Sequence, residues 1–540
     1  MIKTDIYLPI GYGMADVRAA ICARLPLSQD ELSDIRLLRT TLDLNDKTDI
    51  KYRATVGISL SDEREAGLLK MRKKVASVPD YTLTVPTAHL SSRPIVVGLG
   101  PAGLFAALTL AEAGARPIVL ERGLPVEERR ERVDLFSRMG VLDTECNIQF
   151  GEGGAGTYSD GKLKVGSMDK YKMKVLSTLV DCGAPGDILY SSTAHLGTDK
   201  LSCIVAAVRE RILSLGGEII YSARLTDIIH KDGALTAVKY EKGGDTLTLD
   251  ATDVILAIGH SARDTIAKIY DLGVKMEPKG FGIGMRIEHP REYINDLVYG
   301  HGHDTRLESA SYHLVTHLDC GRSVYSFCMC PGGTVVPATS ENGGVVTNGM
   351  SEYLRDGANS NAAFLVSVTP ADFPDPSPLG GFALQAAIEK RAFLAGGSDY
   401  RAPVTTMGDF LDHSTPHSLG SVDPSYPIGT RLCAPEDYLP ECVTSSLRAA
   451  IYDFDKWMPG FLLRDAVMTG AETRSTAPVR ILRDENYVST TLTGLYPAGE
   501  GAGYSGGIVS SATDGVRCAL ALIEKYKKGL LHFGITANKR

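Results

Sequence analysis

The sequence predicts an α/β protein of three units, in which a domain with a parallel sheet is built from two separated segments of the chain. An apolar strand runs directly into a glycine-rich turn and a helix near residue 100, and a second strand, glycine turn and helix follow near residue 500. A long stretch of alternating strands and Gly/Pro loops lies between them. The length of 540 residues also exceeds what one hydrophobic core serves, so two or three domains are expected.

The first unit, residues 1–92, is predicted to be a small α/β module. Hydrophobic periodicity and proline positions delimit its elements. They are a strand at 3–8, a helix at 14–24, strands at 50–60, a helix rich in Lys and Arg at 62–75 and a linker at 79–94. No motif of recognisable chemistry falls within this module, so the sequence assigns no function to it.

The domain with the parallel sheet is predicted over residues 93–265 and 478–530, with residues 266–477 as an insertion. Its first part is a β-α-β unit. The predicted elements are a strand at 94–97, the glycine turn at 98–103, a helix at 104–113, a strand at 117–120, a β-meander at 217–253 that ends in an apolar run at 254–258, and a last helix at 510–527.

The turn Gly98-Leu99-Gly100-Pro101-Ala102-Gly103 has the Gly-x-Gly-x-x-Gly spacing of a dinucleotide-binding fingerprint. Gly98 makes the tight turn, Gly100 lets the backbone approach a pyrophosphate, and Gly103 lets the helix pack closely on the strand. The helix N-terminus offers free N–H groups and its positive dipole end to the phosphates. We expect the whole turn, Pro101 and Ala102 included, to contact the cofactor.

Glu121 ends the second strand of this unit, and Arg122 follows it. A carboxylate at this position accepts hydrogen bonds from ribose hydroxyls and repels a 2′-phosphate, so NADP is not expected in this site. We include both residues among the predicted cofactor contacts. FAD and NAD remain as alternatives at this point.

The C-terminal run from Gly494 to Ile508 favours FAD. It resembles the second cofactor motif of two-dinucleotide-fold flavoproteins, in which an acidic residue binds the ribitol and the next helix points its N-terminus at the isoalloxazine ring. A helix dipole there stabilises an anionic reduced flavin. Glu500 stands where Asp is usual. The FAD contacts that this likeness implies are Gly499, Glu500, Gly506, Gly507 and Ile508, with Gly259 in a turn that resembles the family's Ala-Thr-Gly turn.

With these segments in this order, the chain resembles flavoproteins of the glutathione-reductase type. It is more closely similar to a largely uncharacterised family of FAD-dependent, or NAD(FAD)-utilising, dehydrogenases. That likeness rests on residues 149–163, 326–333 and 472–480 together with the C-terminal motif. It implies a discontinuous Rossmann-like FAD-binding domain with an inserted α+β substrate or cap domain, preceded by the small N-terminal α/β module.

The glycine-rich segment at 151–162 is predicted to cross the pyrophosphate and the flavin. Its glycines allow positive φ and close backbone approach, and its polar side chains can bind phosphate or flavin oxygens. Lys162 could face the flavin O2 or N1. The predicted contacts are Gly153, Gly154, Gly156, Thr157, Ser159, Asp160 and Lys162. A flexible surface loop is the alternative interpretation.

Candidates for the chemistry lie in the insertion. Arg286 would suit a substrate carboxylate and His289 a proton transfer, although charges that alternate along a strand usually mark a solvated face. Cys328 and Cys330 are candidates for a thiol or dithiol that reaches the flavin, or for small buried residues. Arg474 and Arg480 could bind substrate or pair with Glu472.

His301 and His303 have a His-x-His spacing, but only Asp304 lies beside them and no ligand pattern completes a metal site. A solvated loop is the better interpretation, and no metal is predicted.

The leading hypothesis is therefore an FAD-dependent oxidoreductase that moves a hydride or electron pair between FAD and a small molecule. No second complete dinucleotide fingerprint lies between residues 265 and 478, so electrons come from the substrate, from a protein donor or from NAD(P)H that binds transiently. A flavin-dependent RNA-modifying protein and a flavin-bearing sensor or scaffold are the alternatives. The net charge of -8 argues against nucleic acid. Without a signal peptide or a membrane-spanning run, a cytoplasmic location away from the membrane is expected; the oligomeric state is left open.

Overall fold

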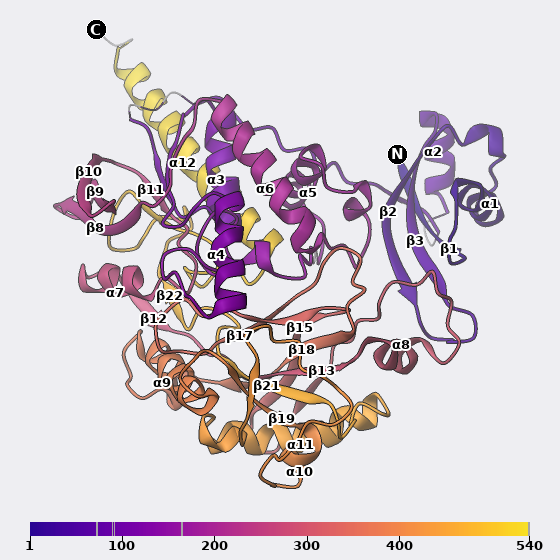
Figure 1. Cartoon of the computed structure of the whole chain (residues 1–540). Coiled ribbons are helices and arrows are strands. Elements are labelled where there is room, and N and C mark those ends of the chain that lie inside the picture. Colours follow the sequence, from indigo (N-terminus) through magenta and orange to yellow (C-terminus); the bar gives the residue numbers. More distant parts are fainter. Residues whose placement is uncertain (72–73, 89, 91, 164–165, 538–540) are drawn as a thin grey trace.

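The computed structural model describes residues 1–71, 74–88, 90, 92–163 and 166–537 (Figure 1). The N-terminal module lies to one side, the helices α3, α6 and α12 lie together at the top, and the helices α9, α10 and α11 lie at the bottom beneath a large sheet. Among the described residues, no helix is both long and apolar enough to cross a membrane.

The N-terminal module is an antiparallel sheet ordered β2-β3-β1-β4. Its elements are β1 (Ile2–Leu8), α1 (Met14–Arg24), η1 (Gln29–Glu31), β2 (Asp34–Asp43), β3 (Lys51–Ser59), α2 (Asp62–Leu69) and β4 (Ala76–Ser77). The helix at 14–24 is confirmed, whereas β2 was not predicted. The helix predicted at 62–75 ends at Leu69, and its residues 72 and 73 lie outside the described residues.

Strands from two distant segments of the chain share one parallel sheet, ordered β23-β11-β5-β6-β7. They are β5 (Ile95–Val97), β6 (Ile118–Leu120), β7 (Glu218–Ile220), β11 (Val254–Leu256) and β23 (Leu495–Pro497). β11 pairs with β5 on one edge and with β23 on the other. The carboxyl ends of parallel strands meet at one edge, which is where ligands bind in open sheets of this kind.

Helices cover this sheet. The elements are α3 (Pro101–Glu112), α4 (Val126–Met139), η2 (Ala155–Tyr158), α5 (Lys170–Asp181), η3 (Gly186–Leu189), α6 (Gly197–Ser214), α7 (Arg263–Asp271) and α12 (Ile508–Ala537). α3 and α12 pack against each other over apolar side chains that include Leu108, Cys518 and Leu522. The predicted meander is present as β8 (Arg224–Lys231), β9 (Ala234–Lys242) and β10 (Asp245–Asp250).

The insertion is built on a seven-stranded sheet ordered β14-β15-β18-β13-β21-β19-β20, antiparallel except between β19 and β20. The strands are β13 (Phe281–Pro290), β14 (Val315–His317), β15 (Ser323–Cys330), β18 (Asn359–Val368), β19 (Ala402–Thr406), β20 (Thr430–Leu432) and β21 (Val467–Glu472). A hairpin of β16 (Thr334–Pro337) and β17 (Thr347–Met350) accompanies it.

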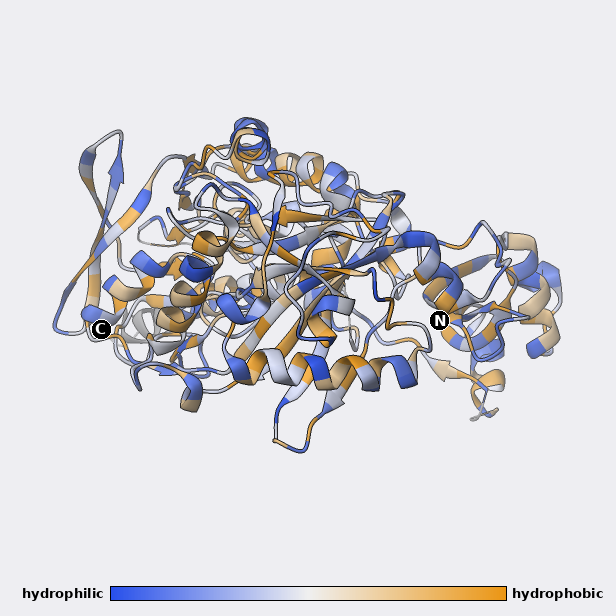
Figure 2. Ribbon diagram, turned by 60° about the horizontal axis from the view of Figure 1, so that its bottom comes forward, coloured by the Kyte–Doolittle hydropathy of each residue, from blue (hydrophilic) through white to orange (hydrophobic). Residues whose placement is uncertain are grey.

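Helices of the insertion bury apolar faces against this sheet. They are α8 (Arg291–Tyr299), α9 (Gly380–Gly396), α10 (Met407–Leu411) and α11 (Glu441–Trp457), with η4 (Pro370–Asp372) and η5 (Pro435–Asp437) between them. In α11, Leu447, Ile451 and Phe454 are buried while Tyr452 and Trp457 are exposed. Figure 2 shows such helices banded in orange and blue, as expected when one face packs and the other meets water.

The two ends of the insertion meet in a short antiparallel pair, β12 (Met276–Pro278) with β22 (Val479–Ile481). Residues more than two hundred positions apart are therefore neighbours at the point where the insertion leaves and rejoins the parallel-sheet domain.

We predict that Gly515→Ala destabilises the protein, because a Cβ at Gly515 in α12 would overlap the carbonyl oxygen of Ala102 in α3. Overpacking of this kind costs about 1–3 kcal/mol. The matched control is Gly67→Ala in the exposed helix α2, where no atom lies within 4 Å of the added Cβ; this change should stabilise by ~0.5–1 kcal/mol. Thermal unfolding of both variants measures the difference, and an unchanged midpoint for Gly515→Ala would contradict it.

Candidate functional site

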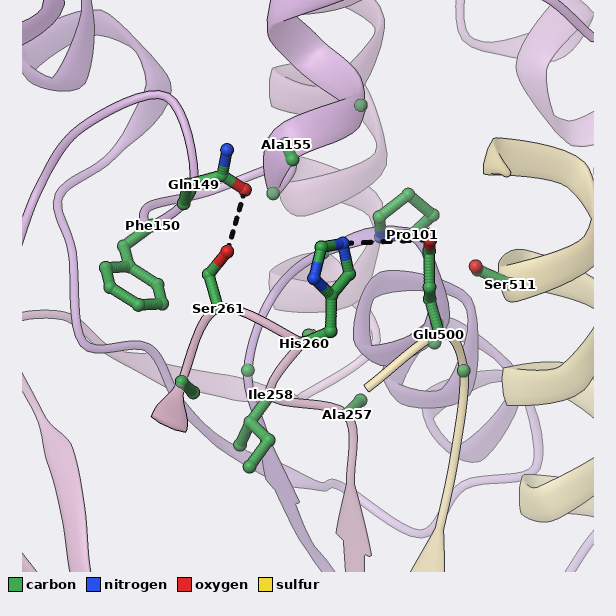
Figure 3. A pocket seen from close by; sticks show the side chains of 18 of the residues that line it. Pro101, Gln149, Phe150, Ala155, Ala257, Ile258, His260, Ser261, Glu500 and Ser511 are labelled. Atoms are coloured by element: carbon green, nitrogen blue, oxygen red, sulfur yellow. Dashed lines mark hydrogen bonds and ion pairs between the residues drawn. The ribbon is translucent and has the colours of Figure 1, made fainter. Parts of the chain in front are cut away.

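One cleft at the carboxyl edge of the parallel sheet gathers the segments predicted to bind the cofactor (Figure 3). They come from five separate parts of the chain. The predicted residues that line the cleft are Gly98, Gly100, Pro101, Ala102, Glu121, Arg122, Gly154, Gly156, Ser159, Asp160, Lys162, Gly259, Gly499, Glu500, Gly506, Gly507 and Ile508. The structure brings these residues together, and their contacts with FAD stay predictions.

Three predicted contacts do not line the cleft. Gly103 packs α3 on the sheet, since a Cβ there would overlap the carbonyl oxygen of Gly98. Gly153 donates its N–H to the carbonyl of Leu99 at 2.8 Å, and Thr157 is buried behind it. These residues support the wall of the cleft, and their direct contacts with the cofactor also stay predictions. The packing role predicted for Gly103 is confirmed.

Glu121 is buried and organises the backbone around it. One carboxylate oxygen accepts the N–H of Leu99 at 2.7 Å, and the other accepts the N–H groups of Gly123 at 2.9 Å and Gly151 at 3.0 Å. A carboxylate therefore joins the glycine turn to the glycine-rich segment. Its neighbour Arg122 stacks on the ring of Phe150, 4.0 Å from the ring centroid.

The glycine-rich segment is held by buried charges, which contradicts the alternative of a flexible surface loop. Asp160 is buried and receives hydrogen bonds from Arg355, and Lys162 Nζ lies 2.8 Å from its Oδ2. Burial raises the pKa of Asp160, but Lys162 and Arg355 outweigh it and lower that pKa below its ordinary value. Lys162 also donates to the carbonyl of Met329. The lysine thus joins this segment to strand β15.

Glu500 and His260 face each other across the cleft, with 3.7 Å between His260 Nε2 and Glu500 Oε1 (Figure 3). Burial raises the pKa of Glu500 to about 7, against a smaller lowering effect of Lys279. Burial lowers the pKa of His260 to about 3, and Arg474 lowers it further. At neutral pH the histidine is uncharged, so this contact is not an ion pair. Ser261, beside it, donates to Gln149 at 3.1 Å.

The raised pKa of Glu500 predicts that protein without cofactor loses stability as pH rises from about 5 to about 8. The folded state holds a proton on Glu500 up to about pH 7, whereas the unfolded state releases it near pH 4.5, so folding becomes less favourable through that window. The raised pKa corresponds to about 1–3 kcal/mol of the free energy of unfolding. This range is lower than the full shift would give, because a quarter of the Glu500 side chain is exposed to water. Glu500→Gln should flatten the dependence of the unfolding midpoint on pH; an unchanged slope would remove Glu500 as its cause.

Arg286 is not available to a substrate. It is fully buried, and its guanidinium makes two hydrogen bonds of 3.0 Å to Glu472. It also donates to Asn361 and Asn348 and to the carbonyl of Cys328 at 2.8 Å. The prediction that Arg286 binds a substrate carboxylate is corrected, because Glu472 already occupies the guanidinium.

His289 lies outside the cleft, so its predicted role in proton transfer is corrected too. It is buried, and its Nε2 lies 2.9 Å from the carbonyl of Phe461. Burial lowers the pKa of His289 to about 4. The interpretation of this strand as a solvated face is also wrong, because β13 lies between β18 and β21 and both its faces are covered.

Cys328 lines the cleft, whereas Cys330 is buried behind it. The pairing of β15 with β18 is irregular between Phe327 and Cys330, and Cys328 has a φ of 41°. A positive φ at a residue other than glycine is uncommon and concentrates at functional sites. Of the alternatives drawn from the sequence, the structure supports a cleft-facing thiol at Cys328.

Arg474 and Arg480 differ in their surroundings. Arg474 lines the cleft but pairs with Glu389 at 2.9 Å rather than with Glu472, and Arg263 binds the same carboxylate. The pairing of Arg474 with Glu472 is corrected. Glu389 had no signal in the sequence, because it lies in an otherwise unremarkable helix far from both arginines.

Arg480 and Lys279 line an opening that adjoins the cleft. The opening shares Phe327, Ser475 and Gly506 with the cleft. Lys279 has a lowered pKa, because of burial and then the charge of Arg480. The pairing of β12 with β22 creates this neighbourhood, so Lys279 could not be singled out from the sequence.

His301 and His303 both lie near Asp296, with His301 almost fully exposed and its Nδ1 2.9 Å from the carboxylate. Across the described ranges, no group of three or more His, Cys, Asp or Glu residues is arranged to hold a metal.

Comparison with known proteins now bears on this site. Residues 280–475, which form most of the insertion, match the family described as FAD-dependent protein, C-terminal domain-like. Over 512 residues the chain is 44% identical to an uncharacterised protein of Clostridium beijerinckii, covering 94% of this chain and 95% of that protein. The chain belongs to the family of this clostridial protein. The insertion that supplies Cys328, Glu472 and Arg474 is thus the region with the FAD-dependent family match.

Solved structures are similar only remotely. A 3-ketosteroid-Δ4-(5α)-dehydrogenase of Rhodococcus jostii RHA1 is 13% identical, with 82% of this chain and 99% of that chain covered and a TM-score of 0.34. A glycerol-3-phosphate dehydrogenase of Bacillus halodurans complexed with FAD is 10% identical, with 82% and 65% covered and a TM-score of 0.35.

Proposed function

We propose that the protein is an FAD-dependent oxidoreductase that moves a hydride or electron pair between bound FAD and a small molecule. The observation that carries the proposal is the single cleft lined by three glycine segments, at 98–102, 154–162 and 499–508. An elongated dinucleotide needs backbone access along its whole length, and these segments supply it. The FAD-dependent family match of the insertion supports the same cofactor.

The residues present fit FAD. A Cβ at Gly154 would stand 2.8 Å from the Cα of Gly100, so only glycine lets these two parts of the cleft wall pack together. At Gly259 and Gly506, which also line the cleft, no atom lies within 4 Å of an added Cβ, so the backbone there is open to a ligand. The start of α3 would hold the pyrophosphate and Glu121 the adenosine ribose. Gly506, Gly507 and the first turn of α12 would face the flavin ring. When bound, FAD supplies reversible two-electron chemistry.

The substrate enters, on this proposal, through the opening that carries Lys279 and Arg480. Arg480 pairs with Glu277 at 3.0 Å, but its buried Nε has no hydrogen-bond partner. Lys279 makes only a long contact of 3.4 Å with Thr476. Two neighbouring cations with spare donors favour an anion between them, and the shared wall at Phe327 leads from there to the cleft. The substrate class is therefore a small carboxylate.

We predict that the purified protein is yellow and releases FAD on denaturation, and that Glu121→Arg lowers FAD content several-fold. Arginine cannot accept the three N–H groups that Glu121 binds, so the glycine turn loses its support. The control is Glu128→Arg, an equal charge change on the exposed face of α4 that should keep wild-type FAD content. Stoichiometric NAD without flavin would contradict the proposal, and co-purifying nucleic acid would favour the RNA-modifying alternative.

We predict that Lys279→Met weakens binding of benzoate, a test carboxylate, by about 10–100-fold, as expected for loss of one charged hydrogen bond. The perturbation of the flavin absorption spectrum measures the dissociation constant. Lys275→Met is the matched control. Lys275 immediately precedes β12, whereas Lys279 immediately follows it, and Lys275 is exposed and does not line the opening. Equal weakening by both variants would point to net charge rather than to a site. Assays with NADH, NADPH and reduced protein donors test the source of electrons separately.

A further inference from the structure

We propose that Cys328 and Cys330 form a reversible dithiol–disulfide pair that exchanges an electron pair with the flavin. The inference rests on the proposed function for the presence of FAD. It concerns residues of the insertion that the cofactor motifs do not use. Among the cysteines of the described chain, Cys328 alone lines the cleft.

The backbone at this point is suited to a disulfide between residues two apart. In a regular strand such residues are separated by about 6.6 Å, near the upper limit of the Cα separations that disulfides span. The irregular pairing between Phe327 and Cys330 and the positive φ of Cys328 bend the chain out of the extended conformation. The thiol of Cys330 turns back, with its Sγ 3.3 Å from the carbonyl oxygen of Cys328.

Several buried groups hold this bend in place. Arg286 Nη1 donates to the carbonyl of Cys328 at 2.8 Å, and Lys162 donates to the carbonyl of Met329. Arg286 is itself fixed by Glu472, and Lys162 by Asp160. A strained conformation of this kind persists only where its surroundings determine it, and such conformations cluster at functional sites.

The two sulfurs have opposite electrostatic environments. A hydrogen bond from Cys330, followed by the charges of Lys162 and Arg286, lowers the pKa of Cys328 below its ordinary value against the effect of burial. The pKa of Cys330 is raised by its bond to Cys328 and by burial. These opposite shifts favour the thiolate on Cys328 and the proton on Cys330. An accessible thiolate beside a buried thiol is the arrangement that thiol–disulfide chemistry requires.

Cys328 lines the same cleft as Glu500 of the second cofactor motif. Its charge is among the groups that raise the pKa of Glu500, so the sulfur and that carboxylate share one region of the cleft. On the proposed function this is the end of the cleft that holds the flavin ring. The thiolate is thus placed beside the redox-active part of the cofactor rather than beside its adenine half.

The reaction balances without a further reagent. The Cys328 thiolate and the Cys330 thiol together lose one electron pair and one proton, and a bond forms between their sulfurs. Bound FAD would supply the acceptor for this electron pair and proton, so no other oxidant is needed. The reverse step restores the thiolate and the thiol. The pair then passes between the flavin and the small molecule of the proposed function.

We predict that anaerobic titration of the holoenzyme with dithionite takes four electrons per flavin, against two in Cys330→Ser, a twofold difference. Mass spectrometry of the oxidised protein should find a peptide that contains a disulfide between residues 328 and 330, and this peptide should disappear after reduction. The control is Cys433→Ser, a half-buried thiol elsewhere, which should still take four electrons. Two electrons in the wild type without the disulfide peptide would overturn the proposal.

Alkylation of the wild type with iodoacetamide tests the thiols without any variant and without turnover. Cys328 should react with a midpoint below that of an ordinary thiol, whereas Cys433, bonded to Asp437 and with a pKa raised to about 12 mainly by burial, should not react below pH 9. A midpoint for Cys328 above pH 8 would refute a thiolate in the cleft. If the protein lacks FAD but shows the disulfide and the reactive Cys328, the proposed function is refuted. The inference that Cys328 and Cys330 form a reversible disulfide would still stand.

Discussion

The buried ion pair between Arg286 and Glu472 is the interaction on which one whole wall of the cleft depends. Taking both charges out of water is unfavourable unless every donor is used, and removing one partner of such a pair typically costs about 3–5 kcal/mol. Arg286 meets this demand by binding Glu472, Asn361 and the carbonyl of Cys328 at once. One side chain thus ties β13, β15, β18 and β21 together and fixes the position of Cys328.

The glycine turn could be predicted from the sequence because its requirements are local. The tight turn at Gly98 and the close packing at Gly103 both arise within a few residues of the strand that precedes them. Glu121 was found for the same reason, since it ends the neighbouring strand. Its bonds to the N–H groups of Gly123 and Gly151 were not foreseen, because a loop that returns from further along the chain supplies one of them.

The insertion could not be predicted to the same depth, because its contacts join residues far apart in the sequence. Arg286 and Glu472 are 186 positions apart, and Arg263 and Glu389 are 126 apart. Alternation of charge along 285–290 predicted a solvated face, but strand order decides exposure, and β13 is central. For the same reason, the proximity of Lys279 and Arg480 could not be predicted from the sequence, because only the pairing of β12 with β22 creates it.

Charge balance connects the two halves of the cleft. The Cys328 thiolate and a reduced flavin are two anions that repel each other in a buried region, and Glu500, whose pKa is raised to about 7, would add a third charge once it loses its proton. Formation of the disulfide removes the charge of Cys328 as the flavin gains one, so the electron pair moves while the net charge of the cleft stays constant. Lys162 and Arg286 bind the carbonyls of Met329 and Cys328 and are held by Asp160 and Glu472. The charges of these buried ion pairs stay fixed. A negative charge can therefore move between the Cys328 sulfur and the flavin at little electrostatic cost.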